Sequence, residues 1–225
     1  MPEIKTTANG HEVQSSVDPI SAHDFRERLG VEYGIDAKSP ARRLEQLQTL
    51  SVEGVAILLE DINKSIQGSV GSLMNHNKVM SIGESSTVAL EDRYDVFLRL
   101  IGDIKMFSPE INPARVGDVL ALGVVALHPF YDGNGRTARV IGMLFRDEYD
   151  SEQYEENFNI VVQPRDIARK KGGFMINGYV PQYPQGFDQS DGAQVSAYLS
   201  GLLKEENDGA YVSCFGQAPL RCDAE

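Results

Sequence analysis

The chain has 225 residues, of which 41% are hydrophobic, and a formal net charge of −12. This length suits one domain with a substantial core and some appendages. The acidic balance argues against a general nucleic-acid binder, which carries a basic surface, and no apolar run approaches the roughly 20 residues that cross a membrane.

The cysteines and the start of the chain indicate the compartment. Cys214 and Cys222 are too few for a disulfide framework or a zinc site. Residues 1–5 lack the basic and apolar regions of a secretory signal. We therefore expect a cytoplasmic protein without membrane or nucleic-acid partners, while export as an effector would leave no recognisable mark. The sequence does not give the oligomeric state, and a homo-oligomer is compatible with it.

The first part of the chain is expected to be a polar tail and connector over residues 1–38, with a short helix at 22–29. Ser39 and Pro40 then form a helix start, an N-cap followed by proline in the first turn. The apolar residues that follow at helical spacing are Leu44, Leu47, Val55, Leu58 and Ile62. They predict one long helix, or two helices with a break at Gly54.

Two short strands are predicted next, at residues 78–83 and 86–90, joined by a polar turn. A helix follows, with core residues on one face: Tyr94, Phe97, Leu98, Ile101, Ile104 and Phe107. Asn112 and Pro113 start a further helix by the same capping logic. It is buried through Leu127, and its glycines, Gly117 and Gly123, favour close helix packing.

Residues 128–139 read His-Pro-Phe-Tyr-Asp-Gly-Asn-Gly-Arg-Thr-Ala-Arg. An imidazole has an ordinary pKa of about 6.5, so His128 can accept a proton near pH 7. Gly133 and Gly135 flank Asn134, and glycines allow a turn with positive φ whose backbone N–H groups bind an anion. The following helix is expected to begin near Arg136, with its unpaired amides facing the same loop.

Two arginines and a carboxylate complete this stretch. Arg136 and Arg139 are three residues apart, so on a helix they share a face and can reach one polyphosphate. Asp132 is suited to hold Mg2+, whose other ligands are phosphate oxygens. Each feature alone is typical of a turn, a structural histidine or a solvated helix face. Together they predict the attack of a hydroxyl on a nucleotide phosphate.

Beyond residue 150 the sequence assigns no function. Residues 159–162 are predicted to be a strand, and residues 193–206 a helix capped by Asp191. A basic cluster over 165–171 is interpreted as solvated surface, and residues 211–215 as a terminal strand.

The stretch at 128–139 resembles the signature of the Fic family, His-Pro-Phe-x-(Asp/Glu)-Gly-Asn-Gly-Arg-x-x-Arg, at every specified position. The resemblance implies a mainly α fold, with a Fic-type helical core over 39–149, a short β-hairpin flap and an irregular C-terminal extension over 150–225. It implies transfer of AMP from ATP, with Mg2+, to a Ser, Thr or Tyr hydroxyl of a protein target. The related Doc-type kinases have a lysine where Gly135 stands, so kinase activity is disfavoured.

The resemblance also assigns roles to single residues. His128 would be the base that deprotonates the target hydroxyl, Asp132 would hold the Mg2+, and Phe130 would anchor the loop. The anion hole and the arginines of the distal phosphates would be formed by Gly133, Asn134, Gly135, Arg136 and Arg139. The hairpin near Lys78–Gly83 would be the flap, which binds the target segment as an added strand.

Residues 49–54, Thr-Leu-Ser-Val-Glu-Gly, fit the inhibitory pattern of the same family, (Ser/Thr)-x-x-x-Glu-(Gly/Asn). The resemblance implies that Glu53 pairs with Arg139 and blocks the γ-phosphate of ATP. A carboxylate in that place neutralises the guanidinium and repels the end of a triphosphate. The alternative is a solvent-facing glutamate on an amphipathic helix.

These observations lead us to expect a protein adenylyltransferase that Glu53 holds inactive. The nearest alternatives keep the fold and either use another donor, such as UMP or phosphocholine, or remove AMP from a modified protein. An alternative of another class is a catalytically silent Fic scaffold or binding module. The intact base, carboxylate and arginines argue against that alternative, because scaffolding requires none of them.

Overall fold

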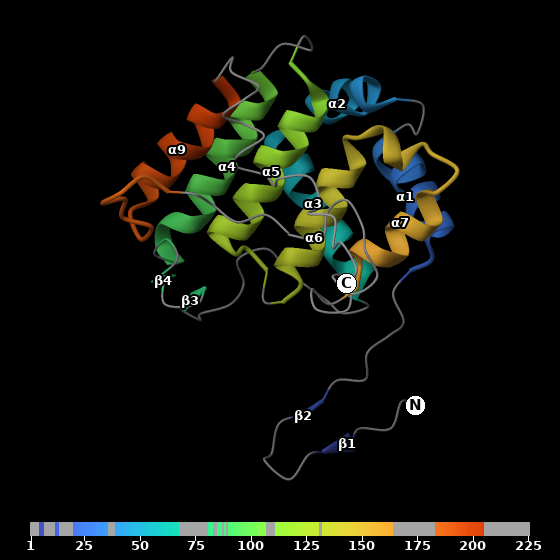
Figure 1. Ribbon diagram of the computed structural model, residues 1–225, viewed down its shortest axis with the longest axis horizontal. Helices are drawn as coiled ribbons and strands as arrows, with labels where there is room; N and C mark the ends of the chain where they lie inside the picture. The colour runs from blue at the N-terminus through green and yellow to red at the C-terminus, as the bar shows by residue number, and fades with distance from the viewer. Residues whose placement is uncertain are drawn as a thin grey trace, which may run out of the picture.

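The computed structural model describes residues 5–6, 12–13, 20–35, 39–67, 81–82, 85–86, 88, 90–106, 111–130, 132–163 and 183–204. These residues are mainly helical, which confirms the predicted class (Figure 1). The α-helices are α1 (Ala22–Tyr33), α2 (Pro40–Thr49), α3 (Val52–Gln67), α4 (Leu90–Met106), α5 (Pro113–Leu127), α6 (Asn134–Leu144), α7 (Tyr154–Val161) and α9 (Gly192–Lys204), and η1 (Asp147–Tyr149) is a 3-10 helix. No helix among the described residues is both long and apolar enough to span a membrane.

Four two-residue strands form two antiparallel pairs. β1 (Lys5–Thr6) pairs with β2 (Glu12–Val13) inside the predicted polar tail. β3 (Ser81–Ile82) pairs with β4 (Ser85–Ser86), within the segment where a hairpin was predicted. The predicted second strand does not extend to residue 90, because Leu90 begins α4. Residues 78–80, 83, 84, 87 and 89, the basic cluster over 165–171 and the strand over 211–215 lie outside the described residues.

Helix α5 is the centre of the described structure. It lies between α4 and α6 in Figure 1, and it also contacts α2 and α9. Its side chains are buried on nearly every side, including those of Val116, Leu120 and Val124. A helix that is apolar all round is stable only inside a core, so the other helices cover α5.

Two glycines let α5 approach its neighbours closely, as predicted. A Cβ atom at Gly117 would lie 2.8 Å from the Cβ of Phe145, and one at Gly123 would overlap the side chain of Leu100. Real Cβ atoms do not approach other atoms this closely, because interiors are packed at crystal-like density. Larger side chains at these positions would push Phe145 and α4 away from α5.

The stretch from Ser39 was predicted to be one long helix or two helices with a break at Gly54; it is two helices, and the break precedes Gly54. Helix α2 ends at Thr49, and Ser51 begins α3, because the Ser51 hydroxyl accepts a hydrogen bond from the Gly54 N–H at 2.9 Å. Gly54 therefore lies inside the first turn of α3. Helix α3 packs against α4 and α6, and so its C-terminal end reaches the 128–139 stretch.

The predicted strand at residues 159–162 is wrong, because these residues end helix α7. Tyr154 and Phe158 are buried one turn apart, and the Phe158 ring lies 5.0 Å from that of Phe25 in α1. A spacing of four residues is helical. In a strand, residue 156 would lie on the same face as residues 154 and 158. Helix α1 is longer than predicted, since it continues to Gly34, which ends it with φ 64°.

The predicted helix after residue 190 is confirmed as α9. Asp191 caps it by accepting hydrogen bonds from the N–H groups of Ala193 and Gln194 at 2.8 and 3.2 Å. The hydrogen bonds from the Gln194 side chain and from these amides lower the pKa of Asp191.

Candidate active site at the start of helix α6

His128 ends helix α5 in the left-handed conformation, with φ 52° and ψ 55°. It is the one non-glycine residue with positive φ among those the structure describes. Its N–H donates to the Val124 carbonyl at 3.0 Å, and its ring Nδ1 lies 3.3 Å from the Val125 carbonyl oxygen. A carbonyl oxygen only accepts hydrogen bonds, so in the neutral ring Nδ1 carries the hydrogen and Nε2 carries the lone pair. The backbone and the ring of His128 are therefore both oriented by the end of α5.

Arg93 of α4 supports His128 from inside the core. This side chain is 1% exposed, and it donates to the carbonyl oxygens of His128 at 3.5 Å and Val88 at 3.1 Å. Burial lowers the pKa of Arg93. Val88 lies two residues after β4, so the guanidinium connects the segment behind the β3–β4 pair to the residue that ends α5. Sequence reasoning missed Arg93, although an arginine within an apolar helix face is a recognisable signal.

The loop after His128 is braced by a pair of reciprocal hydrogen bonds. The Asn134 side chain accepts from the Phe130 N–H at 3.0 Å and donates to the Phe130 carbonyl at 2.8 Å. Phe130 is fully buried, which confirms it as the anchor of the loop, and Asn134 is 2% exposed. The Asn134 side chain thus shapes the loop, and only its backbone N–H remains to bind an anion.

Helix α6 begins at Asn134, two residues earlier than expected. Gly133, at φ 77°, is its N-cap and has no side chain that could cap the first amides. By contrast, the side chains of Ser21, Ser39 and Asn112 cap α1, α2 and α5. Of the two glycines that allow a turn here, only Gly133 has positive φ, whereas Gly135 lies in the first turn of α6 and is exposed there. Its missing side chain leaves the amides of this turn open to a ligand.

Asp132 and Arg136 lie together at the edge of this loop. Asp132 accepts hydrogen bonds from the Gly133 N–H at 2.6 Å and from Arg136 Nη2 at 3.2 Å. Its side chain is 74% exposed, whereas that of Arg136 is 25% exposed. The carboxylate thus faces solvent next to the open amides of α6, where an oxygen-ligated cation and an anion can be held side by side.

Arg139 does not extend beside Arg136 as the spacing predicted. It is 3% exposed and donates to the carbonyls of Val161 at 3.0 Å and Gln163 at 2.6 Å, at the end of α7. The last carbonyls of a helix lack partners within the helix and carry its negative dipole end, so they attract a guanidinium. The third nitrogen, Nη1, lies 3.7 Å from the Cβ position of Gly135. Arg139 thus joins α7 to the start of α6.

Two polar residues of α3, which the sequence did not identify, contact the loop from the other side. Asn63 is 1% exposed and donates to the Asp132 carbonyl and to the Thr137 hydroxyl, both at 3.0 Å. Gln67 accepts a hydrogen bond from Arg136 Nη2 at 2.5 Å. The available signal was an asparagine at helical spacing between the apolar residues Leu59 and Ile66.

The inhibitory pairing of Glu53 with Arg139 stays a prediction, since the hydrogen bonds described above for Arg139 go to other groups. Glu53 is exposed in the first turn of α3, and Asn63, ten residues later, is the residue that reaches the loop. A helix rises 1.5 Å per residue, which places Glu53 about 15 Å from Asn63 along α3. The Arg139 guanidinium donates to the carbonyls at the end of α7. The exposed position of Glu53 is the one expected for the alternative, a solvent-facing glutamate.

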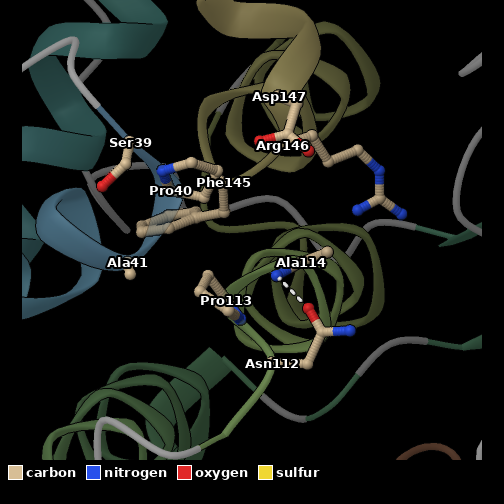
Figure 2. A pocket seen from close by; sticks show the side chains of 9 residues that line it. All are labelled: Ser39, Pro40, Ala41, Asn112, Pro113, Ala114, Phe145, Arg146 and Asp147. Atoms are coloured by element: carbon tan, nitrogen blue, oxygen red, sulfur yellow. Dashed lines mark hydrogen bonds between the residues drawn. The ribbon is translucent and has the colours of Figure 1, made fainter.

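A pocket lies at the other end of α5 (Figure 2). It is lined by the starts of α2 and α5 and by residues 145–147. Both helix starts are capped there, and Figure 2 shows Asn112 accepting from the Ala114 N–H and Arg146 extending away from Ser39 and Pro40. Arg146 pairs with the buried Asp118 at 2.7 Å. The length of α5, about 22 Å at 1.5 Å per residue, separates this pocket from His128.

The comparison with known families agrees with this site. The model of the Fic/DOC family matches residues 56–146. This range begins in α3 and ends just after α6, so it includes Asn63, Gln67, His128 and the whole 128–139 stretch. This match covers less than half of the chain and supports a Fic domain over residues 56–146. Proteins of this family are generally transferases that act on proteins with nucleotide donors. Searches of curated proteins and of solved structures gave no significant match.

Proposed function

We propose that this protein transfers AMP from MgATP to a Ser, Thr or Tyr hydroxyl of a protein target. The observation that carries the proposal is the open start of α6, which lies in one short loop with His128. The amides of Asn134, Gly135 and Arg136 have no side-chain cap, and their helix dipole favours a phosphate. Arg136 adds a guanidinium at the same edge, which can form charge-assisted hydrogen bonds to phosphate oxygens.

Asp132 fits the role of a Mg2+ ligand. Its carboxylate is solvent-accessible, lies next to the open amides and retains lone pairs beyond its two hydrogen bonds. Mg2+ typically takes one or two protein carboxylates, with phosphate oxygens and waters as its remaining ligands. When bound, this ion would neutralise charge on the phosphates and polarise the α-phosphate.

His128 would act as the general base. Its Nε2 takes the proton of the target hydroxyl while the hydroxyl oxygen forms a bond to the α-phosphorus. The bond from that phosphorus to the bridging oxygen breaks, and pyrophosphate leaves with the electron pair. The left-handed cap and the Nδ1 contact to Val125 hold the ring in the tautomer that this step requires. General base catalysis typically contributes about 10²–10⁴-fold to a rate.

We further propose that the β3–β4 pair is the flap on which the target docks. Its backbone can add a target segment as a further strand, which tolerates varied target sequences. Arg93 supports this proposal, because it connects Val88, just after β4, to the carbonyl of His128. A docked hydroxyl would then be held at a set distance from the base.

The test is transfer of label from α-labelled ATP with Mg2+, read as self-modification, in wild type, His128→Ala and Glu53→Gly. We expect His128→Ala to lose at least about 100-fold in labelling while it still binds nucleotide, since the base acts only in the chemical step. Loss of ATP binding in that variant would contradict the role of His128. Strong activation of Glu53→Gly would support the inhibitory role predicted from the sequence, whereas labelling like wild type, which the exposed position of Glu53 favours, would contradict it.

Labelling from other nucleotides, or removal of AMP from a modified protein, would favour the alternatives that keep the fold. The absence of label under all these conditions would favour a silent scaffold.

A further inference from the structure

We infer that Gln67 is a further substrate-contacting residue of this site, whose side-chain N–H2 group donates to a phosphate oxygen of the bound nucleotide. The inference rests on the proposed function, because it requires a polyphosphate at the start of α6. It extends the site to a helix that lies far before the 128–139 stretch in the chain.

The orientation of the Gln67 carboxamide follows from its contact with Arg136. Arg136 Nη2 is a donor only, so the Gln67 atom 2.5 Å away must be the carbonyl oxygen. The amide nitrogen, Nε2, then lies on the other side of the group, against the backbone of Gly133. A Cβ atom at position 133 would overlap Nε2 and the carbon to which it is bound. The glycine thus leaves space for the Gln67 amide as well as allowing φ 77°.

The Nε2 group is a hydrogen-bond donor beside the open amides of α6. No residue that the structure describes accepts a hydrogen bond from it, and Gln67 is half-buried. Gly133 is the N-cap of α6, so Nε2 lies next to the first amides of that helix. An anion bound to these amides is within the reach of the same donor, and hydrogen bonds to charged acceptors are stronger than neutral ones.

Asn63 makes this placement rigid. It lies one turn before Gln67 on the same face of α3, and it is held by hydrogen bonds to both the loop and α6. A donor on a helix that is fixed by a buried side chain is positioned more accurately than one on a loop.

The neutral amide meets two requirements that a charged side chain does not. Its oxygen accepts from Arg136, and its nitrogen lies against Gly133, the N-cap of α6. A glutamate at 67 would still accept from Arg136, but it would place a carboxylate oxygen where the donor now lies and would repel a phosphate.

Gln67 could instead hinder nucleotide binding, and this possibility predicts the opposite effect of removing its side chain. Arg136 Nη2 already donates to Gln67 and Asp132, so Gln67 could instead compete with the phosphate for this nitrogen. If it did, removal of the Gln67 side chain would strengthen nucleotide binding, whereas our inference requires that binding weaken.

The experiment measures the dissociation constants of MgATP and of inorganic pyrophosphate for the full chain by calorimetry. The variants are Gln67→Ala, Gln67→Met, which keeps the length of the side chain, and Gln67→Glu. The control is Gln153→Glu, which adds the same charge at the exposed start of α7. We expect weaker binding by about tenfold for Gln67→Ala and Gln67→Met, a larger loss for Gln67→Glu, and no change for Gln153→Glu.

Unchanged or tighter binding in both Gln67→Ala and Gln67→Met would overturn the inference. Thermal unfolding of each variant distinguishes a lost ligand contact from a lost fold, since Gln67→Met retains the packing of the stem. If wild type binds neither probe and transfers no label, the proposed function fails and this inference fails with it. If wild type binds and labels while all Gln67 variants bind equally well, only the role of Gln67 falls.

Discussion

The starts of α5 and α6 satisfy their backbone amides in different ways. At the start of α5, Asn112 accepts from the Ala114 N–H at 3.0 Å and Pro113 removes one donor from the first turn. At the start of α6, Gly133 offers no side chain, and the exposed Gly135 follows in the first turn. A side chain of the protein caps the amides at the start of α5, whereas the amides at the start of α6 remain as donors for a ligand.

The surroundings of the two helix starts reinforce this difference. Near the start of α5, the guanidinium of Arg146 is engaged by the buried carboxylate of Asp118. Near the start of α6, Arg136 contacts the neutral Gln67 and the exposed Asp132. Helix α7 also lacks a side-chain cap, but Glu155 and Glu156 in its first turn would repel an anion. A helix start without a side-chain cap therefore indicates an anion site when cationic and donor groups lie beside it.

The largest effect is expected from Gly133→Ala. The new Cβ would overlap Gln67, and an L-residue at φ 77° costs about 1–2 kcal/mol in addition. We expect loss of ATP binding and a fall in AMP transfer of more than about 100-fold, comparable with the loss of oxyanion-type donors. Binding and transfer are measured by calorimetry and by α-labelled ATP.

Gly34→Ala is the matched control for this variant. Gly34 has φ 64° at the end of α1, and a Cβ there would meet no atom within 4 Å. It should lower the free energy of unfolding by about 1 kcal/mol and leave transfer unchanged. Equal transfer in the two variants would mean that Gly133 has only a conformational role.

A smaller effect is expected from Asn63→Ala. This change leaves the Thr137 hydroxyl and the Asp132 carbonyl without their buried donor, which should cost about 1–3 kcal/mol of unfolding free energy. It should also weaken ATP binding severalfold, because the loop and α3 lose their connection. Denaturant unfolding and ATP binding are the two measurements.

Ser65→Ala is a control on the same helix. Ser65 is also buried and accepts from Arg28 Nη1 at 3.3 Å, but it does not contact the loop. If Ser65→Ala weakens ATP binding as much as Asn63→Ala does, the effect comes from α3 as a whole and not from the loop contact.

The smallest effect is expected from Asn112→Ala, which removes the cap of α5. The loss of an N-cap typically costs about 1 kcal/mol, so the unfolding midpoint in urea should fall modestly. Transfer should be unchanged, because this helix start belongs to the structure and not to the site. If Asn112→Ala reduces transfer under conditions in which the variant is fully folded, the start of α5 also contributes to activity and the contrast between the two helix starts is contradicted.

Much of the fold could be predicted because its signals are local. Ser39, Asn112 and Asp191 were recognised as caps, and the buried faces of α4 and α5 were recognised from their spacing. The errors occurred where a short segment fits two structures. Residues 160–162 are apolar and β-branched, yet packing against α1 holds this segment at the end of a helix.

The candidate site was predicted in part. Its loop is local, so the anchor Phe130 was identified from the sequence and is buried as expected. The direction of Arg139 was not predictable, because it depends on where the end of α7 lies. The contact of Asn63 with the loop was not predictable for a similar reason, since it depends on how α3 packs against α6.

The sequence by itself determined that a base, a carboxylate, glycines and two arginines belong to one loop and the helix that follows it, because twelve consecutive residues carry them. Only the tertiary structure decided which arginine remains at the loop edge and which is used to join α6 to α7. It also decided that Gln67 and Asn63 belong to the site. These roles depend on the packing of α3 and α7 against α6, and such contacts between segments distant in the chain leave no pattern in the residues of either segment alone.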